Sequence, residues 1–569
     1  MTPRPCQVLD RVRAPADVRA LPAADLPRLA ADLRAEIVSS VSRTGGHLAS
    51  SLGAVELVIG LLRVFDPARV RVVWDVGHQT YAWKLLTGRR GGFGTIRTLD
   101  GLSGFCNPEE SDCDAFVSGH AGSALAVAAG MAAAAEPPEV VAVVGDASLA
   151  NGVSLEALAN LSSGRGRLVL VVNDNGQAGV GPRLGRAFFE GFGLDYAGPV
   201  DGHDVEAVAA ALESARRMPR SVAVHVVTVK GKGFAPAEAD PAGWHGVGPF
   251  DVAAAGAQAV SAPGSWSAAF GGEAMRLAAA DPRVCALTAA MRDGTGLAPF
   301  AAAHPDRFFD SGICEEHLVA FAAGLAKAGM RPLVAVYSTF LQRAVDQVMH
   351  DVCLLGLPVV FAVDRAGCVG RDGRTHHGMF DVAMLRCLPG LTICQPADAG
   401  ELRQMLDLAV AQGGPWVVRY PRGAAAAARP ASNPVRTGRA EQVCGADAEV
   451  QIWALGGQVA KARAACGLLA GRGVRAGVVN ARFVKPFDAE LLAAQRAAGR
   501  WIVSLEDGAV AGGFGEAIGA DLKLGWPDVF IGHGDVSELE ARHGLTAEAV
   551  AEAVARACPR RGGNGLDAE

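Results

Sequence analysis

Polar residues suited to holding a metal ion and a diphosphate follow two apolar runs in the first half of the chain. Val140–Val144 leads into Gly-Asp146-Ala147-Ser148, and Leu168–Val172 leads into Asn-Asp-Asn175. At the carboxyl end of a parallel strand, the helix that follows offers free N–H groups to a phosphate, while carboxylate and amide oxygens suit Mg²⁺. Asp146 and Asn175 are therefore predicted Mg²⁺ ligands beside a diphosphate. A plain Gly-Asp turn is the alternative interpretation.

A second candidate for chemistry is Glu315, which precedes an apolar-periodic helix predicted over residues 318–328. A carboxyl group at a strand end among apolar residues is poorly solvated, which raises its pKa and favours proton sharing with a ring nitrogen. The alternative is a carboxylate at a helix start, where the helix dipole favours it.

The elements that must position these residues alternate between strands and helices. Nearly all-apolar runs such as Val222–Val227, Leu333–Val336 and Val359–Val363 are typical of strands covered on both faces by helices, which predicts parallel sheets. Leu341, Val345, Val348 and Val352 recur at helical spacing and are expected along one helix face. The fold class is therefore α/β.

Two changes in composition divide the chain into three α/β blocks. They are the Pro- and Gly-containing stretch 253–265 and the Ala-, Pro- and Ser-rich stretch 424–434. The predicted domains are residues 1–260, 261–432 and 433–569, each built on a mainly parallel sheet flanked by helices. In the third, strands are expected at 449–455, 475–479 and 501–505, with a helix near 459–470.

Composition excludes several classes of function. The 569 residues carry 53 Lys and Arg against 59 Asp and Glu, which gives no basic surface for nucleic acid. The N-terminal stretch resembles no secretory signal, and no 18-residue apolar run predicts a membrane span, so a cytoplasmic location is expected. The 12 Cys contain no Cys-x-x-Cys pair and are expected to be buried thiols.

Several ordered strings resemble the 1-deoxy-D-xylulose-5-phosphate synthases, which are transketolase-related enzymes. The resemblance covers nearly the whole chain, and the spacing from Asp146 to Asn175 also resembles the diphosphate and Mg²⁺ motif of thiamine-diphosphate enzymes. The strings are Ser42–Ser50, Trp74–Gln79, Gly198–Asp204, Tyr337–Arg343, Asp364–Gly367, Asp372–His376 and Arg419–Gly423.

The resemblance implies a transferase that condenses pyruvate with D-glyceraldehyde 3-phosphate, with loss of CO₂, through a carbanion on thiamine diphosphate. The product would feed isoprenoid, thiamine and pyridoxal synthesis. The resemblance also implies two thiamine-diphosphate-binding folds, a transketolase C-terminal-like domain and a homodimer. Two alternatives stay open, namely a related acyloin-forming ligase with a different acceptor and a non-catalytic regulatory paralogue.

The resemblance carries roles over to single residues of this chain. Gln177 would add a backbone carbonyl to the Mg²⁺ ligands Asp146 and Asn175, and Glu315 would contact the aminopyrimidine. Expected cofactor contacts are His78, Gly119, His120, Ala121, Ala147, Ser148, Lys230, Phe234 and Phe340. Arg365 and Arg422 would bind the acceptor phosphate, since guanidinium groups suit bidentate contacts. Tyr337, Arg343 and Asp372 would line the same pocket, and His47, His245 and His376 are the candidates for proton transfer.

This chain departs from the family pattern around the predicted diphosphate site. Ala147 replaces a usual glycine, and its Cβ is harmless only if φ is negative. Residues 176–179 differ from the usual sequence, and only residues 176–200 separate Asn175 from Asp201, where the family has a much longer segment.

The shortened segment predicts altered retention of thiamine diphosphate or altered handling of pyruvate, because a more open site loses contacts to both. The measurements are the dissociation constant of the cofactor and the KM for pyruvate. Values that match those of full-length relatives would remove this expectation.

Overall fold

The computed structural model describes residues 7–134, 139–161, 166–176, 184–254, 264–427 and 434–558. The chain divides into two compact units. The first contains Met1–Val260 with Gly312–Cys314 and Arg371–Thr375, and the second contains Ser261–Ser311, Glu315–Gly370 and His376–Glu569. The three predicted domain ranges stay a prediction.

The first unit is built on one parallel five-stranded sheet in the order β1-β2-β3-β5-β4. Its strands are β1 (Val70–Asp75), β2 (Glu139–Gly145), β3 (Leu168–Asp174), β4 (Asp195–Asp201) and β5 (Val222–Val227). Its helices are α1 (Pro15–Ala20), α2 (Leu26–Thr44), α3 (Leu48–Gly53), α4 (Val55–Val64), α5 (Tyr81–Lys84), α6 (Ala124–Ala132), α7 (Gly152–Leu161), α8 (Arg186–Gly191), α9 (Val205–Arg217) and α10 (Ala235–Ala239).

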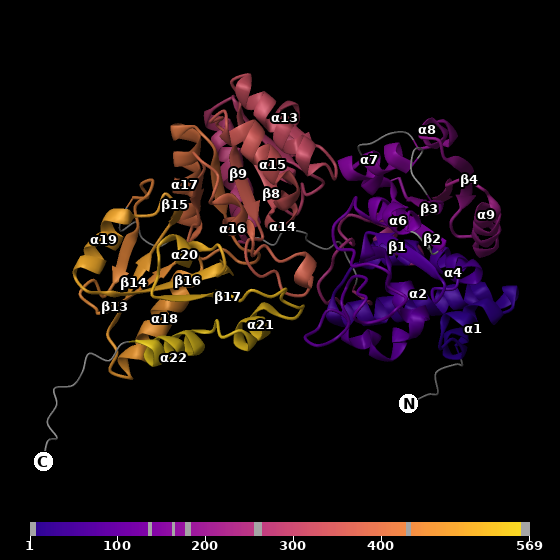
Figure 1. The fold of residues 1–569 in the computed structure, drawn as a ribbon, viewed down its shortest axis with the longest axis horizontal. Coiled ribbons are helices and arrows are strands. Elements are labelled where there is room, and N and C mark those ends of the chain that lie inside the picture. The colour runs from indigo at the N-terminus through magenta and orange to yellow at the C-terminus, as the bar shows by residue number, and fades with distance from the viewer. Residues whose placement is uncertain are drawn as a thin grey trace, which may run out of the picture. The chain divides into compact units, whose positions relative to one another are not determined.

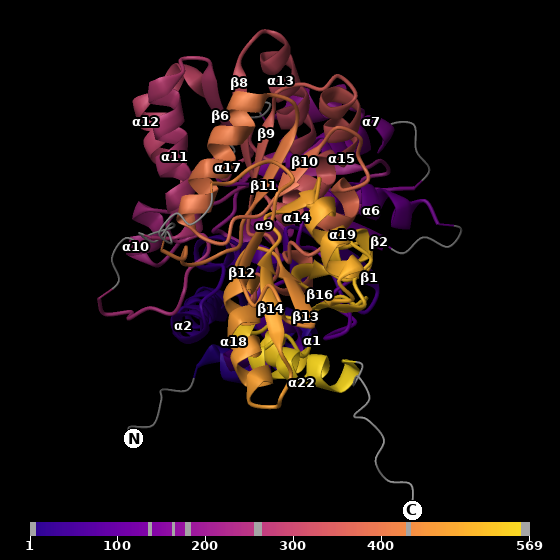
Figure 2. The same ribbon diagram turned by 90° about the vertical axis from the view of Figure 1, so that its left-hand side faces the viewer.

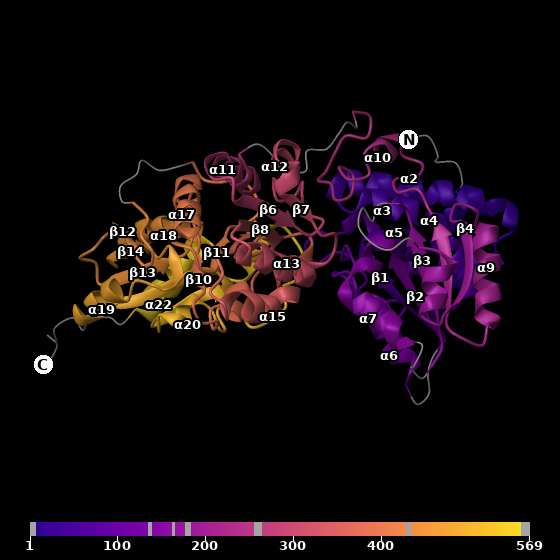
Figure 3. The ribbon, with the colours of Figure 1, turned by 90° about the horizontal axis from the view of Figure 1, so that it is seen from above.

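Helices cover both faces of this sheet, as the apolar runs predict. Val141 and Val143 of β2 pack into the core formed with α2, α4 and α9, whereas Val140, Ala142 and Val144 pack into the core formed with α6 and α7. Figure 3 shows α2 and α4 on one side of β1, β2 and β3, and α6 and α7 on the other. Since successive side chains of a strand alternate between faces, a strand buried on both must be apolar throughout.

The second unit contains two sheets. The larger has the order β15-β10-β11-β9-β8-β6-β7, and the smaller has the order β12-β14-β13-β16-β17. The larger sheet contains β6 (Val284–Thr288), β7 (Phe308–Asp310), β8 (Arg331–Tyr337), β9 (Val360–Asp364), β10 (Thr392–Cys394), β11 (Trp416–Arg419) and β15 (Phe483–Lys485). The smaller contains β12 (Glu441–Cys444), β13 (Val450–Ala454), β14 (Ala476–Asn480), β16 (Trp501–Ala509) and β17 (Leu522–Trp526).

Pairing in both sheets is parallel except at β15 with β10 and at β12 with β14. The prediction of an α/β chain with three mainly parallel sheets is therefore confirmed. The strand β15 was not predicted. It comes from the C-terminal block of the sequence but pairs with β10 of the larger sheet.

Helices cover the sheets of the second unit as well. They are α11 (Trp266–Ala280), α12 (Ala298–Ala303), α13 (Glu315–Lys327), α14 (Ser338–Leu341), α15 (Val345–Gln347), α16 (Asp381–Leu385), α17 (Ala399–Gln412), α18 (Gln458–Ala470), α19 (Ala489–Ala497), α20 (Phe514–Ala517), α21 (Val536–Arg542) and α22 (Ala547–Ala557). Alternate residues of β8 and β9 pack toward α13 or toward α11 and α17. Figure 2 shows α11 and α13 on opposite sides of β8, and Figure 1 shows α18 and α22 beside β13.

Two sequence predictions about helices need correction. The segment with Leu341, Val345, Val348 and Val352 is not one regular helix, because α14, a 3₁₀ turn and α15 precede a π-helical turn at Val348–Cys353. Leu341, Val348 and Val352 are nevertheless buried on one core. The helix expected over 318–328 begins earlier, at Glu315, and ends at Lys327.

A buried cluster of charges joins the two sheets of the second unit. The Arg419 guanidinium at the end of β11 donates to Asp381 (Nε–Oδ2 2.9 Å) and to Asp507 on β16 (Nη1–Oδ1 2.6 Å). Its side chain is 1% exposed, and Gln395 contacts both Arg419 and Asp507. A buried charge is tolerated only when it is fully paired and hydrogen-bonded.

Arg419→Met is expected to destabilise the protein by about 3–5 kcal/mol, because Asp381 and Asp507 would remain buried without their cation. The urea unfolding midpoint measures this loss. The matched control is Arg475→Met, since the Arg475 side chain is 66% exposed beside an exposed Asp447, and it should change stability by less than about 0.5 kcal/mol. Equal midpoints for the two variants would contradict the role given to Arg419.

No helix in the described ranges combines the length and the apolar character that a membrane crossing requires.

Candidate active site

In the first unit, the predicted metal ligands lie at the ends of neighbouring strands. Asp146 follows β2 and Asn175 follows β3, and Gly145 pairs with Asn173 in the parallel register of these strands. Asp146 is 6% exposed. Within the described residues, the buried Asn175 Oδ1 atom has no hydrogen-bond partner. An amide oxygen left without a donor suits a cation, so the two side chains fit the predicted role.

The segment after Asp146 differs from the expected helix. A 3₁₀ turn, Asp146–Ala150, comes first, and α7 begins only at Gly152. Ala147 lies in this turn and does not adopt a positive φ. Its Cβ is therefore compatible with the backbone, so alanine in place of the usual glycine causes no backbone strain at this position. Gln177 lies outside the described residues.

Three histidines gather in the first unit. The ring centroids of His47 and His245 are 5.7 Å apart, and those of His78 and His245 are 5.1 Å apart. His245 is exposed to solvent. Even so, desolvation by the surrounding protein, followed by the nearby charge of Lys230, holds its pKa well below the ordinary value. His245 is therefore neutral at neutral pH and can accept a proton.

Lys230 connects this cluster to the strand ends. Burial lowers the pKa of its amine, and the carboxylate of Asp146 partly opposes that effect. The predicted cofactor contact Phe234 packs against Trp244, with ring centroids 5.2 Å apart. A contact of Phe234 with a cofactor stays a prediction.

Glycines allow close approach of the backbone beside the predicted diphosphate contacts. A Cβ on Gly119 would lie 2.2 Å from the Thr375 side chain, and His120 Nε2 lies 2.8 Å from the Thr375 carbonyl oxygen. Gly122, with φ +94°, donates its N–H to the Asp75 carboxylate (2.8 Å to Oδ2). Ala121 is buried, and Ser148 lies buried in the 3₁₀ turn after Asp146. Thr375 and Asp75 were missed from the sequence because their partners are distant along the chain.

Asp372 belongs to the first unit, where its Oδ1 atom pairs with Arg97 at 2.9 Å. Tyr337 and Arg343 belong to the second unit. The pocket that the sequence predicts for these three residues stays a prediction, as do the catalytic roles of His47, His245 and His376.

In the second unit, Glu315 is the first residue of α13 and is 3% exposed. The expectation that it ends a strand is wrong, and its place at a helix start is the alternative weighed from the sequence. The expected change of pKa is confirmed, since burial raises the pKa of its carboxyl to about 7. Its Oε2 atom is buried and has no hydrogen-bond partner in the described part of the chain. A group of this kind can both donate and accept a proton near neutral pH.

Aromatic and cationic side chains of the second unit form a second group. Tyr337 stacks on Phe340 (centroids 5.8 Å apart), and Phe340 meets His376 edge-on at 5.5 Å. The Arg365 guanidinium lies 3.8 Å from the centroid of the Tyr337 ring. Arg365 adopts φ +57°, a left-handed conformation that a non-glycine residue rarely takes and that often marks a functional position.

Asp364 lies buried next to this group. It is 0% exposed, and it accepts a hydrogen bond from Ser267 (Oγ–Oδ2 2.6 Å). Burial raises its pKa to about 6, although the charges of Arg365 and Arg422 act in the opposite direction. The charges of Arg365 and Arg422 thus both act on one buried carboxyl group, and their contact with a phosphate stays a prediction.

Two other features bear on where ligands could bind. Among the described residues, no three His, Cys, Asp or Glu side chains gather as a metal site, so a bound Mg²⁺ would need Asn175 and backbone oxygens besides Asp146.

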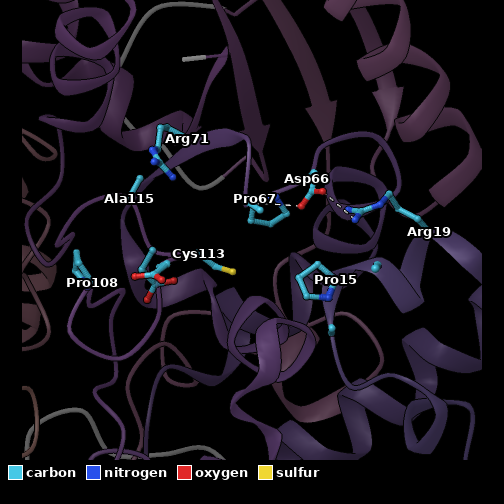
Figure 4. Close-up of a pocket in the computed structure, with 13 residues that line it drawn as sticks. Pro15, Arg19, Asp66, Pro67, Arg71, Pro108, Cys113 and Ala115 are labelled. Carbon is cyan, nitrogen blue, oxygen red and sulfur yellow. Dashed lines mark hydrogen bonds and ion pairs between the residues drawn. The ribbon is translucent and has the colours of Figure 1, made fainter. Parts of the chain in front are cut away.

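A surface pocket of the first unit, shown in Figure 4, is lined by residues that include Pro15, Arg19, Asp66 and Arg71. It contains none of the predicted site residues.

Comparison with known families covers most of the chain. The model for 1-deoxy-D-xylulose-5-phosphate synthase matches residues 9–186 and 180–228. The two matched ranges overlap at 180–186, inside the shortened segment 176–200. The transketolase pyrimidine-binding domain matches residues 263–427, and the transketolase C-terminal domain matches residues 438–550.

Curated relatives match along nearly their whole length. The protein named 1-deoxy-D-xylulose-5-phosphate synthase 2 of Geobacter sulfurreducens is 42% identical over 617 residues, covering 96% of this chain and 98% of its own. The 1-deoxy-D-xylulose-5-phosphate synthase of Thiobacillus denitrificans is 42% identical, covering 97% and 98%. A crystal structure of transketolase from Campylobacter jejuni covers 93% of this chain and 99% of its own at 17% identity, with a TM-score of 0.46. The fold class therefore rests on the sheet topology.

Glu315→Gln is expected to stabilise the protein at pH 8 and to have little effect at pH 5. The pKa of Glu315 is about 7 in the folded chain against an ordinary 4.5, so the folded state holds a proton that the unfolded state releases as the pH rises from 4.5 to 7. Folding stability of the parent protein therefore falls over this window, by about 3 kcal/mol at most. The Glu315→Gln variant has no carboxyl group to titrate at this position, so it does not lose this folding stability.

Urea unfolding midpoints at pH 5 and pH 8 measure the effect. Glu316→Gln, at the neighbouring half-buried position, is the matched control and should follow the parent protein at both pH values. A Glu315→Gln variant with the pH dependence of the parent would show that this carboxyl does not titrate near neutrality.

Proposed function

The chain belongs to the 1-deoxy-D-xylulose-5-phosphate synthase family, and on that premise we propose that it condenses pyruvate with D-glyceraldehyde 3-phosphate, with loss of CO₂, to give 1-deoxy-D-xylulose 5-phosphate. The observation that carries the proposal is the buried Glu315 carboxyl, whose pKa lies near 7 and whose Oε2 atom has no hydrogen-bond partner in the described residues. Such a group suits proton exchange with a ring nitrogen.

The cofactors in this proposal are thiamine diphosphate and Mg²⁺. Residues of the first unit that fit the diphosphate and metal are Asp146, Asn175 and Lys230, because they combine oxygen ligands with a cation beside them. Thiamine diphosphate, when bound, would supply the electron sink for decarboxylation of a 2-oxo acid. Glu315 would hold a proton against the aminopyrimidine, and Phe340 would pack on its ring.

Residues of the chain would also bind the acceptor phosphate and transfer protons. Arg365 and Arg422 would bind the acceptor phosphate, and the stacking of Arg365 on Tyr337 fixes the plane of its guanidinium. The lowered pKa of His245 keeps its ring neutral at neutral pH, and it is one candidate for proton transfer. His47 and His376 remain the other candidates for proton transfer.

A homodimer is part of the proposal. Apolar side chains stand exposed on α13 and around the π-helical turn that packs on it, with Phe321 38%, Met349 47%, Leu354 72% and Leu355 60% exposed. An exposed apolar patch of this kind favours contact with a second protein surface. Light scattering tests this point, and the mass of one chain would contradict it.

The direct test is a reaction of the purified protein with thiamine diphosphate, Mg²⁺, pyruvate and D-glyceraldehyde 3-phosphate, with the product identified by mass spectrometry. We expect 1-deoxy-D-xylulose 5-phosphate, and none from Glu315→Gln. Turnover only with unphosphorylated aldehydes would instead support an acyloin-forming ligase. No turnover with any acceptor would support a regulatory paralogue.

Arg365→Leu is expected to raise the KM for D-glyceraldehyde 3-phosphate about 10- to 100-fold, because a charge-assisted contact to the phosphate is lost. The KM for unphosphorylated D-glyceraldehyde should stay unchanged. Arg292→Leu serves as the control, since the Arg292 side chain is 50% exposed and pairs with its neighbour Asp293. Equal effects of Arg365→Leu on both aldehydes would exclude Arg365 as a phosphate ligand.

A further inference from the structure

The loop that carries Lys230 is fixed on both sides of that residue. The Val229 N–H donates to His203 Nε2 at 2.8 Å, and the Lys232 carbonyl oxygen accepts from Arg34 Nε at 2.8 Å. Between these two points, the Gly231 N–H donates to the Ala49 carbonyl oxygen at 2.8 Å. The Val229 side chain is 44% exposed, so burial alone does not hold this loop.

One carboxylate connects the two residues that hold the loop. Arg34 donates to both Glu56 oxygens at 2.6 Å, and His203 Nδ1 lies 3.1 Å from Glu56 Oε2. Burial alone would raise the pKa of Glu56, but the hydrogen bonds from His203 and Arg34 outweigh it and lower the pKa to about 2. Glu56 is therefore ionised at any physiological pH.

The ionised carboxylate determines how His203 must be protonated. An ionised carboxylate only accepts hydrogen bonds, so Nδ1 of His203 must carry the proton that it shares with Glu56. Nε2 must then keep its lone pair, because it accepts the Val229 N–H. Each ring nitrogen thus has one defined role, which makes His203 a rigid bridge between Glu56 and the loop.

The surrounding backbone leaves the loop little freedom to move. A Cβ on Gly233, with φ +82°, would lie 2.6 Å from Arg34 Cδ, and a Cβ on Gly53 would lie 2.8 Å from the Val229 carbonyl oxygen. The loop therefore packs closely against α2 and α3. A shift of the loop would therefore have to break the contacts of His203 or Arg34.

We propose that His203 is a positioning residue, which acts through the Val229 N–H to fix the loop that carries Lys230. Arg34 and Glu56 complete the support by fixing Lys232 and the ring of His203. The consequence for the cofactor rests on the proposed function, in which Lys230 contacts thiamine diphosphate. No contact of His203 itself with the cofactor is required.

Two substitutions separate the two hydrogen bonds of His203. In His203→Gln, the side-chain carbonyl oxygen can take the place of Nε2 and accept the Val229 N–H. In His203→Asn, the shorter amide can take the place of Nδ1 and donate to Glu56, but it does not reach Val229. The surface variant His350→Asn is the matched control, because the His350 side chain is 70% exposed.

The first measurements use the cofactor-free protein. We expect His203→Asn to accelerate amide hydrogen exchange at Val229 and to increase the rate of Lys230 acetylation at a fixed pH, because the loop is no longer fixed. His203→Gln and His350→Asn should both match the parent protein. Parent-like exchange and acetylation in His203→Asn would overturn the proposal, and so would equal changes in the Asn and Gln variants.

The dissociation constant of thiamine diphosphate then tests the link to the cofactor. We expect it to rise roughly tenfold in His203→Asn, because the loop that carries Lys230 loses one hydrogen bond, and to be restored in His203→Gln. Altered exchange with unchanged cofactor affinity would refute this link and leave the proposed function standing. Failure of the parent protein to bind thiamine diphosphate would instead refute the proposed function, while the exchange and acetylation results would still decide the role of His203.

Discussion

Burial of both faces of the parallel sheets is the constraint on which the rest of the structure depends. The residues of β2 and β3 alternate between two cores, so neither strand can carry a charged side chain along most of its length. Polar side chains that bind a ligand can therefore stand only where the strands end. Because parallel neighbours end at the same edge, Asp146 and Asn175 are brought to one side of the sheet.

A second constraint is the charge that the second unit buries where its two sheets meet. Arg419 ends β11, and its guanidinium is shared by Asp381, Asp507 and Gln395. The chain then continues through Tyr420, whose carbonyl oxygen accepts the Ala366 N–H. This bond ties the segment that leads to Arg422 to the residue after Arg365. Pairing of a structural arginine thus fixes the backbone next to both arginines proposed for the phosphate.

Much of this fold could be predicted because the apolar runs are long and uninterrupted. The runs 140–144, 168–172, 222–227 and 333–336 lie in strands, and the run 359–363 lies in β9 except for Val359, which precedes it. The raised pKa of Glu315 was expected from its apolar neighbours. Local spacing was less informative where tertiary packing decides the helix type, as in the irregular segment 338–353.

The supporting contacts could not be predicted, because they join residues far apart in the sequence. His203 follows β4 and Lys232 follows β5, but their partners Glu56 and Arg34 come from the first 60 residues. The strand β15 likewise pairs with β10 of another block. His203 stands in the family string 198–204, which was the only signal of its importance, and that string carries no information about what the side chain contacts.

Desolvation shifts the pKa of basic and acidic groups in opposite directions, because burial disfavours whichever form is charged. In the first unit it lowers the pKa of Lys230 and His245. In the second unit it raises the pKa of Glu315 to about 7 and that of Asp364 to about 6, which favours carboxyl groups that keep a proton to donate. The direction of each shift follows from the residue type, because the charged form of Lys or His is the protonated one and that of Glu or Asp is the deprotonated one. The same burial that lets the sheets form therefore also shifts the pKa values of the groups that the proposed carbon–carbon bond formation would use.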